Sequence, residues 1–231
     1  VIDLPSFYAT FDVGMRERSE IKSTAVDVAR LLAKLKQENV NGVILDLRRN
    51  GGGSLEEAIN LTGLFIKEGP VVQVWNGVPE REVEHDYDKD PSVLYEGPLI
   101  VLTSRFSASA SGILAGALQD YGLALIGGDA GTHGKGTVQS ANGLKPLMDK
   151  SLTNEPGALK LTIKKFYRAS GASTQLRGVS PDIILPSVAN ESKDIGESAL
   201  DTPLPWDTIP SAKYERLNMV APYLSDLLKR S

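Results

Sequence analysis

The chain has 231 residues, of which 41% are hydrophobic and 23% are charged, and its formal net charge is −4. These values are ordinary for a globular protein, and the length allows one large domain or two small ones. The absence of cysteine excludes a thiol nucleophile, disulfides and cysteine metal sites. No long basic tract or membrane-length apolar run occurs, so we expect no nucleic-acid partner and no membrane span.

The first half of the chain alternates predicted strands and helices. Residues 1–11 are expected to form a strand, and apolar residues at helical spacing predict an amphipathic helix from Ser19 to Asn39. Val43–Leu47 is a nearly continuous apolar strand, typical of a sheet that is covered on both faces. This alternation favours an α/β fold with a mainly parallel sheet.

Three glycines follow that strand, and Ser54 and Glu57 then match a capping box for a helix that runs to about Ile66. A strand, a glycine turn and a helix N-terminus together form an anion-binding arrangement. No lysine follows the glycines, so a P-loop is not indicated.

Weaker patterns predict the remaining elements. Asn76-Gly77 indicates a hairpin turn, and a charged loop follows at residues 86–91, with His85 at its edge. Residues 187–210 are acidic and rich in proline, and we expect them to be extended and held by Leu204 and Trp206. Further strands are predicted at residues 71–75, 81–84, 158–168 and 181–186, and a helix is predicted at residues 218–229.

Residues 98–139 carry the residues with the clearest chemistry. A buried strand leads into a turn with serines at 107, 109 and 111, and that turn opens a helix that ends near Gly122. A serine at a helix N-terminus lies where unpaired N–H groups favour a developing oxyanion. Lys135 lies between two glycines, and desolvation would favour its neutral form. The alternative to a catalytic pair is that Ser107 only caps the helix and that Lys135 is a solvated charge on a loop.

Several ordered motifs resemble the tail-specific, or C-terminal processing, serine proteases, a family that uses a Ser–Lys dyad. The resemblance extends from Val1 to about Ile209, and it implies a crotonase/Clp-protease-like core with helices on both sides of the sheet. The motifs are Phe106-Ser-Ala-Ser-Ala-Ser111, Gln119-Asp-Tyr-Gly122, Gly134-Lys-Gly-Thr-Val-Gln139, Lys165-Phe-Tyr-Arg168 and Ser173-Thr-Gln-Leu-Arg-Gly-Val-Ser-Pro-Asp-Ile-Ile184.

The resemblance implies a role for particular residues. The middle serine, Ser109, would be the nucleophile, and Lys135 would be its general base, positioned by Gln139. Asp120 matches an aspartate that is implicated in some members. No metal or cofactor is implied. The oxyanion hole would be formed by the backbone N–H groups of Ala110 and Gly52, with Gly51 and Gly53 as the alternatives to Gly52.

The chain departs from the family pattern at two places. Gly112 stands where an acid is usual, and the loop before Lys135 is one residue longer, which places the lysine 26 residues after Ser109. A catalytically degenerate protease that serves as a peptide-binding scaffold is therefore an alternative. A crotonase-type acyl-thioester enzyme is a third candidate, although the serine and lysine motifs do not suit it. His133, beside the lysine, is expected to be an incidental neighbour.

The resemblance also implies an organisation and a setting. Residues 1–186 would form the protease catalytic domain, and residues 187–231 a C-terminal extension. The family selects protein substrates by their C-terminal tails, usually through a PDZ domain. We find no PDZ-like segment here and expect one in the full-length protein, of which this chain would be a fragment. A periplasmic or cell-envelope location is implied.

Overall fold

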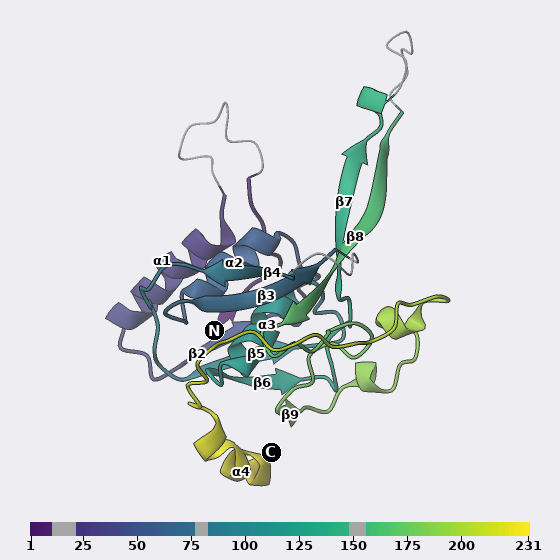
Figure 1. Cartoon of the computed structure of the whole chain (residues 1–231). Coiled ribbons are helices and arrows are strands. Elements are labelled where there is room, and N and C mark those ends of the chain that lie inside the picture. The colour runs from purple at the N-terminus through teal and green to yellow at the C-terminus, as the bar shows by residue number, and fades with distance from the viewer. Residues whose placement is uncertain (11–21, 77–82, 148–155) are drawn as a thin grey trace.

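The computed structural model describes residues 1–10, 22–76, 83–147 and 156–231 (Figure 1). The helices are α1 (Thr24–Gln37), α2 (Leu55–Gly63), α3 (Ala110–Asp120) and α4 (Ala221–Arg230), with 3₁₀ turns η2 (Lys145–Leu147), η3 (Val188–Asn190) and η4 (Glu197–Ala199). The strands are β1 (Ile2–Asp3), β2 (Val43–Asp46), β3 (Gly69–Trp75), β4 (Glu84–Asp88), β5 (Leu99–Thr103), β6 (Ala124–Gly128), β7 (Thr137–Gly143), β8 (Ala158–Arg168) and β9 (Ile183–Ile184). Among these helices none is long and apolar enough to cross a bilayer.

The first sheet is parallel throughout, with the strand order β1-β2-β5-β6-β9. Its central strands are apolar because both faces are covered, and Leu45, Val101 and Ile126 are at most 1% exposed. The α/β class and the mainly parallel sheet are therefore confirmed. Parallel strands end at the same edge of a sheet, so the loops that follow β2 and β5 lie together. One of the contacts between them is the hydrogen bond from the Ala108 N–H to the Asn50 carbonyl, at 3.1 Å.

The second sheet is antiparallel, with the order β4-β3-β8-β7. Strands β7 and β8 project together from the rest of the chain as a long two-stranded arm (Figure 1). Residues 158–168 form the predicted strand. One face was expected to be buried along its whole length, but buried residues occur only near its C-terminal end. Phe166 is 2% exposed, whereas Leu159, Leu161 and Ile163 on the arm are each about 46% exposed.

Helix α3 lies at the centre of the core. Its residues are apolar on nearly every side, and Leu114, Ala115 and Leu118 have no exposed surface. A helix that is apolar all round is stable only when neighbours surround it. Helix α2, strand β6 and parts of β3 and β8 supply that cover.

The capping box predicted for α2 forms only in half. The Ser54 hydroxyl accepts a hydrogen bond from the Glu57 N–H, as predicted. The second hydrogen bond of a capping box, from the Ser54 N–H to the Glu57 carboxylate, is absent because the Ser54 N–H donates to the Phe7 carbonyl. Glu57 instead accepts from the Ser23 hydroxyl and the Ala25 N–H, at 2.9 and 2.8 Å. One buried carboxylate thus joins the first turns of two helices.

Three other predictions need correction. The first strand stops at Asp3, because Pro5 cannot continue a hydrogen-bonded ladder. Helix α1 begins at Thr24 with Ser23 as its cap, whereas Ser19, the predicted start of the helix, lies outside the described residues. Strands β3 and β4 form the predicted hairpin, with Val74 paired to Glu84, and β4 continues to Asp88. Gly77 of the predicted turn lies outside the described residues. The stretch predicted as a charged loop therefore begins inside β4.

The segment after β9 runs along the body of the chain without long elements before α4. The Trp206 indole N–H donates to the Ser173 carbonyl, and the Arg177 guanidinium stacks 3.9 Å above its ring. Asp207 pairs with Lys165 of β8 at 2.6 Å. Trp206 thus holds the segment as expected, but Leu204 is 43% exposed and does not.

Candidate active site

The three serines of the turn have different surroundings. The Ser107 hydroxyl donates to the Leu47 carbonyl and accepts from the Ser104 N–H, while the Ser111 hydroxyl donates to the Asn50 carbonyl. Both side chains are fully buried. Ser107 is therefore a turn hydroxyl rather than a helix cap. Each of these two hydroxyls is committed to backbone groups, which leaves Ser109 as the candidate nucleophile.

Ser109 occupies the N-cap position of α3 in an unusual conformation, with φ 53° and ψ −114°. Such a backbone costs on the order of 1–3 kcal/mol in a residue other than glycine, and it persists only where the surroundings enforce it. The side chain makes no capping hydrogen bond to the helix. Its hydroxyl is thus presented at the helix N-terminus, where the unpaired N–H groups of the first turn favour negative charge.

Lys135 lies on the loop between β6 and β7, and its ammonium nitrogen donates to the Gln139 Oε1 at 3.0 Å. Burial lowers the pKa of Lys135, and the nearby charge of Lys160 lowers it further, while Glu197 acts in the opposite direction. The amide of Gln139 holds the amine without adding a negative charge that would raise this pKa. These surroundings suit a lysine that acts as a base.

Ser109 and Lys135 line one cavity of about 340 Å³, although they are far apart in sequence. The loop before Lys135 thus leaves the lysine on the same cavity as the serine. The lining residues are Gly51, Gly53, Leu55, Ser109, Ala110, Ile113, Lys135, Thr137, Val138, Gln139, Lys160 and Phe166.

The glycine turn approaches the serine closely, and its three glycines differ in their contacts. The Gly52 N–H already donates to the Asn50 Oδ1 at 2.8 Å, and Gly52 is buried and does not line the cavity. Its neighbours Gly51 and Gly53 are exposed and do line it. Gly51 and Gly53 thus share the cavity with Ala110, at the start of α3.

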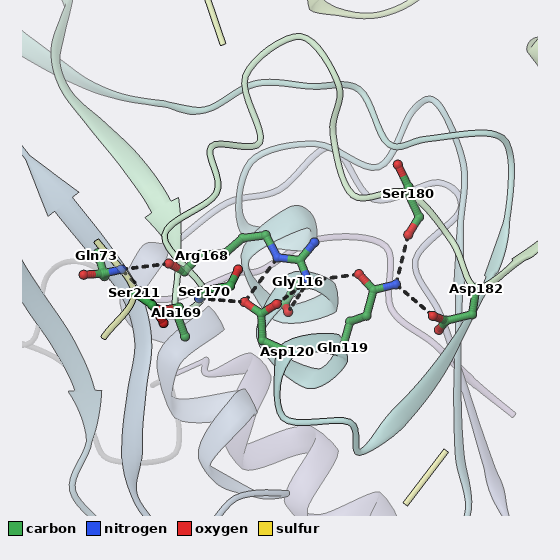
Figure 2. A network of polar contacts seen from close by, with 10 residues as sticks. All are labelled: Gln73, Gly116, Gln119, Asp120, Arg168, Ala169, Ser170, Ser180, Asp182 and Ser211. Carbon is green, nitrogen blue, oxygen red and sulfur yellow. Dashed lines mark hydrogen bonds and ion pairs between the residues drawn. The ribbon is translucent and has the colours of Figure 1, made fainter. Parts of the chain in front are cut away.

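Asp120 lies at the far end of α3 and does not line the cavity. Its carboxylate accepts from the Arg168 guanidinium at 2.5 and 3.2 Å and from the Ser170 N–H at 3.1 Å. Figure 2 shows this cluster, in which Gln119 also binds Arg168 and extends the contacts to Asp182. The aspartate at the negative end of the helix dipole thus has a cationic partner, and it joins α3 to β8.

Two other residues noted in the sequence have plain surroundings. Within 4 Å, a Cβ atom at Gly112 would meet only the Thr132 hydroxyl, at 3.9 Å, so the glycine there is not required by a close backbone contact. His133 does not line the cavity, and its Nδ1 lies 3.9 Å from Glu197. Over the described ranges, no group of three or more His, Asp or Glu side chains is arranged to hold a metal ion.

Sequence reasoning missed three residues that shape the site. Asn50 is fully buried and bonds to the Leu4 carbonyl and the Gly52 N–H through its amide. Lys160 reaches the cavity from the arm. Gln175 is fully buried and binds the backbone beside Lys135. Of the three, only Asn50 could have been singled out by local turn propensity. It lies directly before the glycines, and asparagine side chains often bond to the backbone of a turn.

Solved structures place this fold in a class. A photosystem II D1 C-terminal processing protease superposes with a TM-score of 0.61 and 27% identity, covering 79% of this chain and 41% of that one. Mature CPAF in complex with lactacystin superposes with a TM-score of 0.60 over 99% of this chain and 50% of that one, at 16% identity, which shows the fold alone. The fold is that of the C-terminal processing proteases.

Sequence comparison identifies the family. Peptidase family S41 matches residues 1–185, and the C-terminal domain of tail specific protease matches residues 190–231. The chain belongs to peptidase family S41. A tail-specific protease of Haemophilus influenzae is 46% identical over 93% of this chain, and a carboxy-terminal-processing protease of Bartonella bacilliformis is 38% identical over 72%. The chain spans 28% and 35% of the lengths of these two relatives.

Proposed function

We propose that this chain carries the catalytic site of a serine endopeptidase in which Ser109 is the nucleophile and Lys135 is the general base. The observation that carries this proposal is the shared cavity of the two residues. Ser109 is the serine of the turn without a backbone partner for its hydroxyl, and the Lys135 amine is held by Gln139. A nucleophile and a base that is oriented by a third group form the general arrangement for covalent catalysis.

The proposed reaction has two stages. In the first, the neutral Lys135 amine accepts the Ser109 proton as the oxygen attacks a peptide carbonyl, and the resulting ammonium protonates the leaving amine. In the second, Lys135 accepts a proton from a water that attacks the acyl-enzyme, and Ser109 is restored. The lowered pKa of Lys135 supports this cycle, because a larger fraction of the amine is neutral at a given pH.

The tetrahedral intermediate needs donors for its oxyanion. We assign one to the Ala110 N–H, at the first position of α3, and the other to the Gly53 N–H, with Gly51 as the alternative. Ala110, Gly51 and Gly53 all line the cavity. Each such donor contributes on the order of 10²- to 10³-fold to turnover in other acyl-transfer enzymes.

We further propose that the substrates are proteins selected by their C-terminal tails, as the names of the relatives indicate. A PDZ domain elsewhere in the full-length protein would provide this selection. Residues 1–186 would be the catalytic domain and residues 187–231 an extension specific to tail-specific proteases, in line with the match of the latter to their C-terminal domain. The periplasm or cell envelope is the proposed location.

The experiment is cleavage of one unfolded protein, with and without an apolar C-terminal tail, by the unmodified chain and by Ser109→Ala and Lys135→Ala. A serine-directed fluorophosphonate provides a second readout of the nucleophile. Ser111→Ala is the matched control, because its hydroxyl bonds to the backbone.

We expect both site variants to lose cleavage, Ser109→Ala to lose labelling, and the control to keep both. We also expect this chain alone to discriminate weakly between the two substrates. Labelling of another serine would contradict the assignment of the nucleophile. Peptide binding by a folded chain with neither labelling nor cleavage would instead support the scaffold alternative.

A further inference from the structure

The loop that carries Lys135 is held from outside the catalytic cavity. The Gly136 N–H donates to the Gln175 Oε1 at 2.9 Å, so the backbone directly after the lysine is fixed by a buried side chain. The Leu176 N–H donates to the Gly134 carbonyl at 2.8 Å on the other side of the lysine. The residues that flank Lys135 are therefore both bound to the segment around Gln175.

Gln175 in turn depends on a residue of the C-terminal segment. Its amide nitrogen donates to the Glu197 Oε1 at 3.1 Å, which orients the amide so that its oxygen faces Gly136. Glu197 begins η4 and also contacts the lysine loop directly, because its N–H donates to the His133 carbonyl at 2.8 Å. The Glu197 side chain is 13% exposed. A hydrogen bond to such a carboxylate is stronger than one between neutral groups.

The residues just before η4 are held by Arg105, which lies in the turn that contains the three serines. The Arg105 guanidinium donates to the Ile195 carbonyl. Arg105 belongs to the serine turn, and its N–H is bound by Asp129 at 2.8 Å. The segment that delivers Glu197 is therefore tied to the turn that bears the nucleophile.

The backbone at Gly136 lies close to Gln175, so that only glycine fits there without displacement. A Cβ atom at Gly136 would lie 2.8 Å from the Gln175 backbone nitrogen and 3.1 Å from the Gln175 Cβ. The close approach means that a shift of Gln175 displaces the backbone beside Lys135 directly. Packed interiors transmit such shifts because they contain little free volume.

We infer that Gln175 and Glu197 are positioning residues for Lys135, and that the C-terminal segment thereby completes the catalytic site. The inference rests on the proposed function of Lys135 as the base. The two residues hold the backbone on which the lysine is placed, and neither lines the cavity. A displacement of about 1 Å in a catalytic group costs on the order of a hundredfold in rate, so this support has a measurable effect.

Glu197 also acts on Lys135 through its charge. The pKa of Lys135 is lowered first by burial and then by the charge of Lys160, and it is raised by Glu197. His133 faces the same carboxylate. Loss of the Glu197 charge alone should therefore lower the pKa of Lys135 further, while loss of the hydrogen bond should displace it. The two effects can be separated by substitution.

The experiment compares Glu197→Gln, Glu197→Ala and Gln175→Ala in the intact protein. Gln at 197 retains an oxygen that can accept from Gln175 and removes the charge, whereas Ala removes both. Glu191→Ala is the control, because Glu191 is an exposed acid in the same segment. The readouts are kcat, KM, the dependence of kcat/KM on pH, and the pH dependence of acylation of Lys135 by an amine-reactive ester, followed by mass spectrometry.

We expect the two Ala variants to lose kcat by about tenfold or more with little change in KM. Glu197→Gln should retain most of the kcat of the unmodified protein. It should move the rising limb of the kcat/KM profile to lower pH, and the pH dependence of Lys135 acylation should shift in the same direction. Variants that match Glu191→Ala in all readouts, or that lose activity only in proportion to their unfolded fraction, would overturn the inference. The acylation profile does not require peptidase activity, so failure of the proposed function remains distinguishable.

Discussion

Substitution of Gly52 by alanine tests how the glycine turn shapes the serine. A Cβ atom at Gly52 would lie 2.7 Å from the Ala108 carbonyl oxygen and 2.9 Å from the Ser109 Cβ. Both distances are shorter than van der Waals contact, and one involves backbone that cannot rotate away. The φ of +104° at Gly52 is also a conformation that residues other than glycine rarely adopt.

The expected cost has two parts. The backbone conformation costs on the order of 1–3 kcal/mol in the folded state when alanine occupies it. Relief of the overlap requires Ser109 or the glycine turn to move by several tenths of an ångström or more. Because small displacements of a nucleophile have large effects, kcat/KM should fall by about a hundredfold in the molecules that remain folded.

The assay combines urea denaturation with cleavage of an unfolded protein and the rate of fluorophosphonate labelling. Gly51→Ala is the matched control, because a Cβ atom there meets nothing within 4 Å. It should leave stability within about 0.5 kcal/mol of the original. Equal stability in urea and equal labelling rates for Gly52→Ala and Gly51→Ala would refute the reasoning. The close contact between the glycine turn and Ser109 would then not set the position of the nucleophile.

Three further predictions concern single side chains. Ser107→Ala should lower the free energy of unfolding by about 1–3 kcal/mol in urea, because its buried partners lose their hydrogen bonds; a loss of turnover per folded molecule would contradict its structural role. Arg168→Met should cost about 3–5 kcal/mol by the same measurement, because it leaves the Asp120 carboxylate buried without its partner; a cost below about 1 kcal/mol would refute this. Lys160→Gln should raise the pKa of Lys135, so the rising limb of kcat/KM should move to higher pH at low salt. An unchanged limb in a pH series at fixed ionic strength would refute that assignment.

Local patterns predicted the elements whose signals lie within one stretch of chain. The apolar run of β2 and the Ser54 cap of α2 are examples, because burial and capping each depend on neighbouring residues. The predicted hairpin is present as β3 and β4, but β4 continues to Asp88 into the stretch predicted as a loop, because pairing with β3 rather than local composition sets where the strand ends. The capping box at Glu57 failed in half because a distant helix competes for the carboxylate.

The candidate site shows the same division. The resemblance led to Ser109, Lys135 and Gln139, and the structure brings them into one cavity. The three glycines of the turn are equivalent in sequence, and only the side chain of Asn50 determines which N–H is occupied. The contacts of Gln175 cross tens of residues, so no window along the chain contains them.

The contact between Glu197 and the lysine loop has a consequence for protein synthesis. A ribosome produces Ser109 before Glu197 by 88 residues (197 − 109), which takes about 4 to 18 s at roughly 5–20 residues per second. During that interval the nascent chain has its nucleophile but lacks one support of the loop that bears the base. In our proposal the protease thus matures only when the late segment has emerged and docked. A nascent chain that has not yet reached Glu197 is thereby restrained from cleaving itself or the unfolded proteins around it.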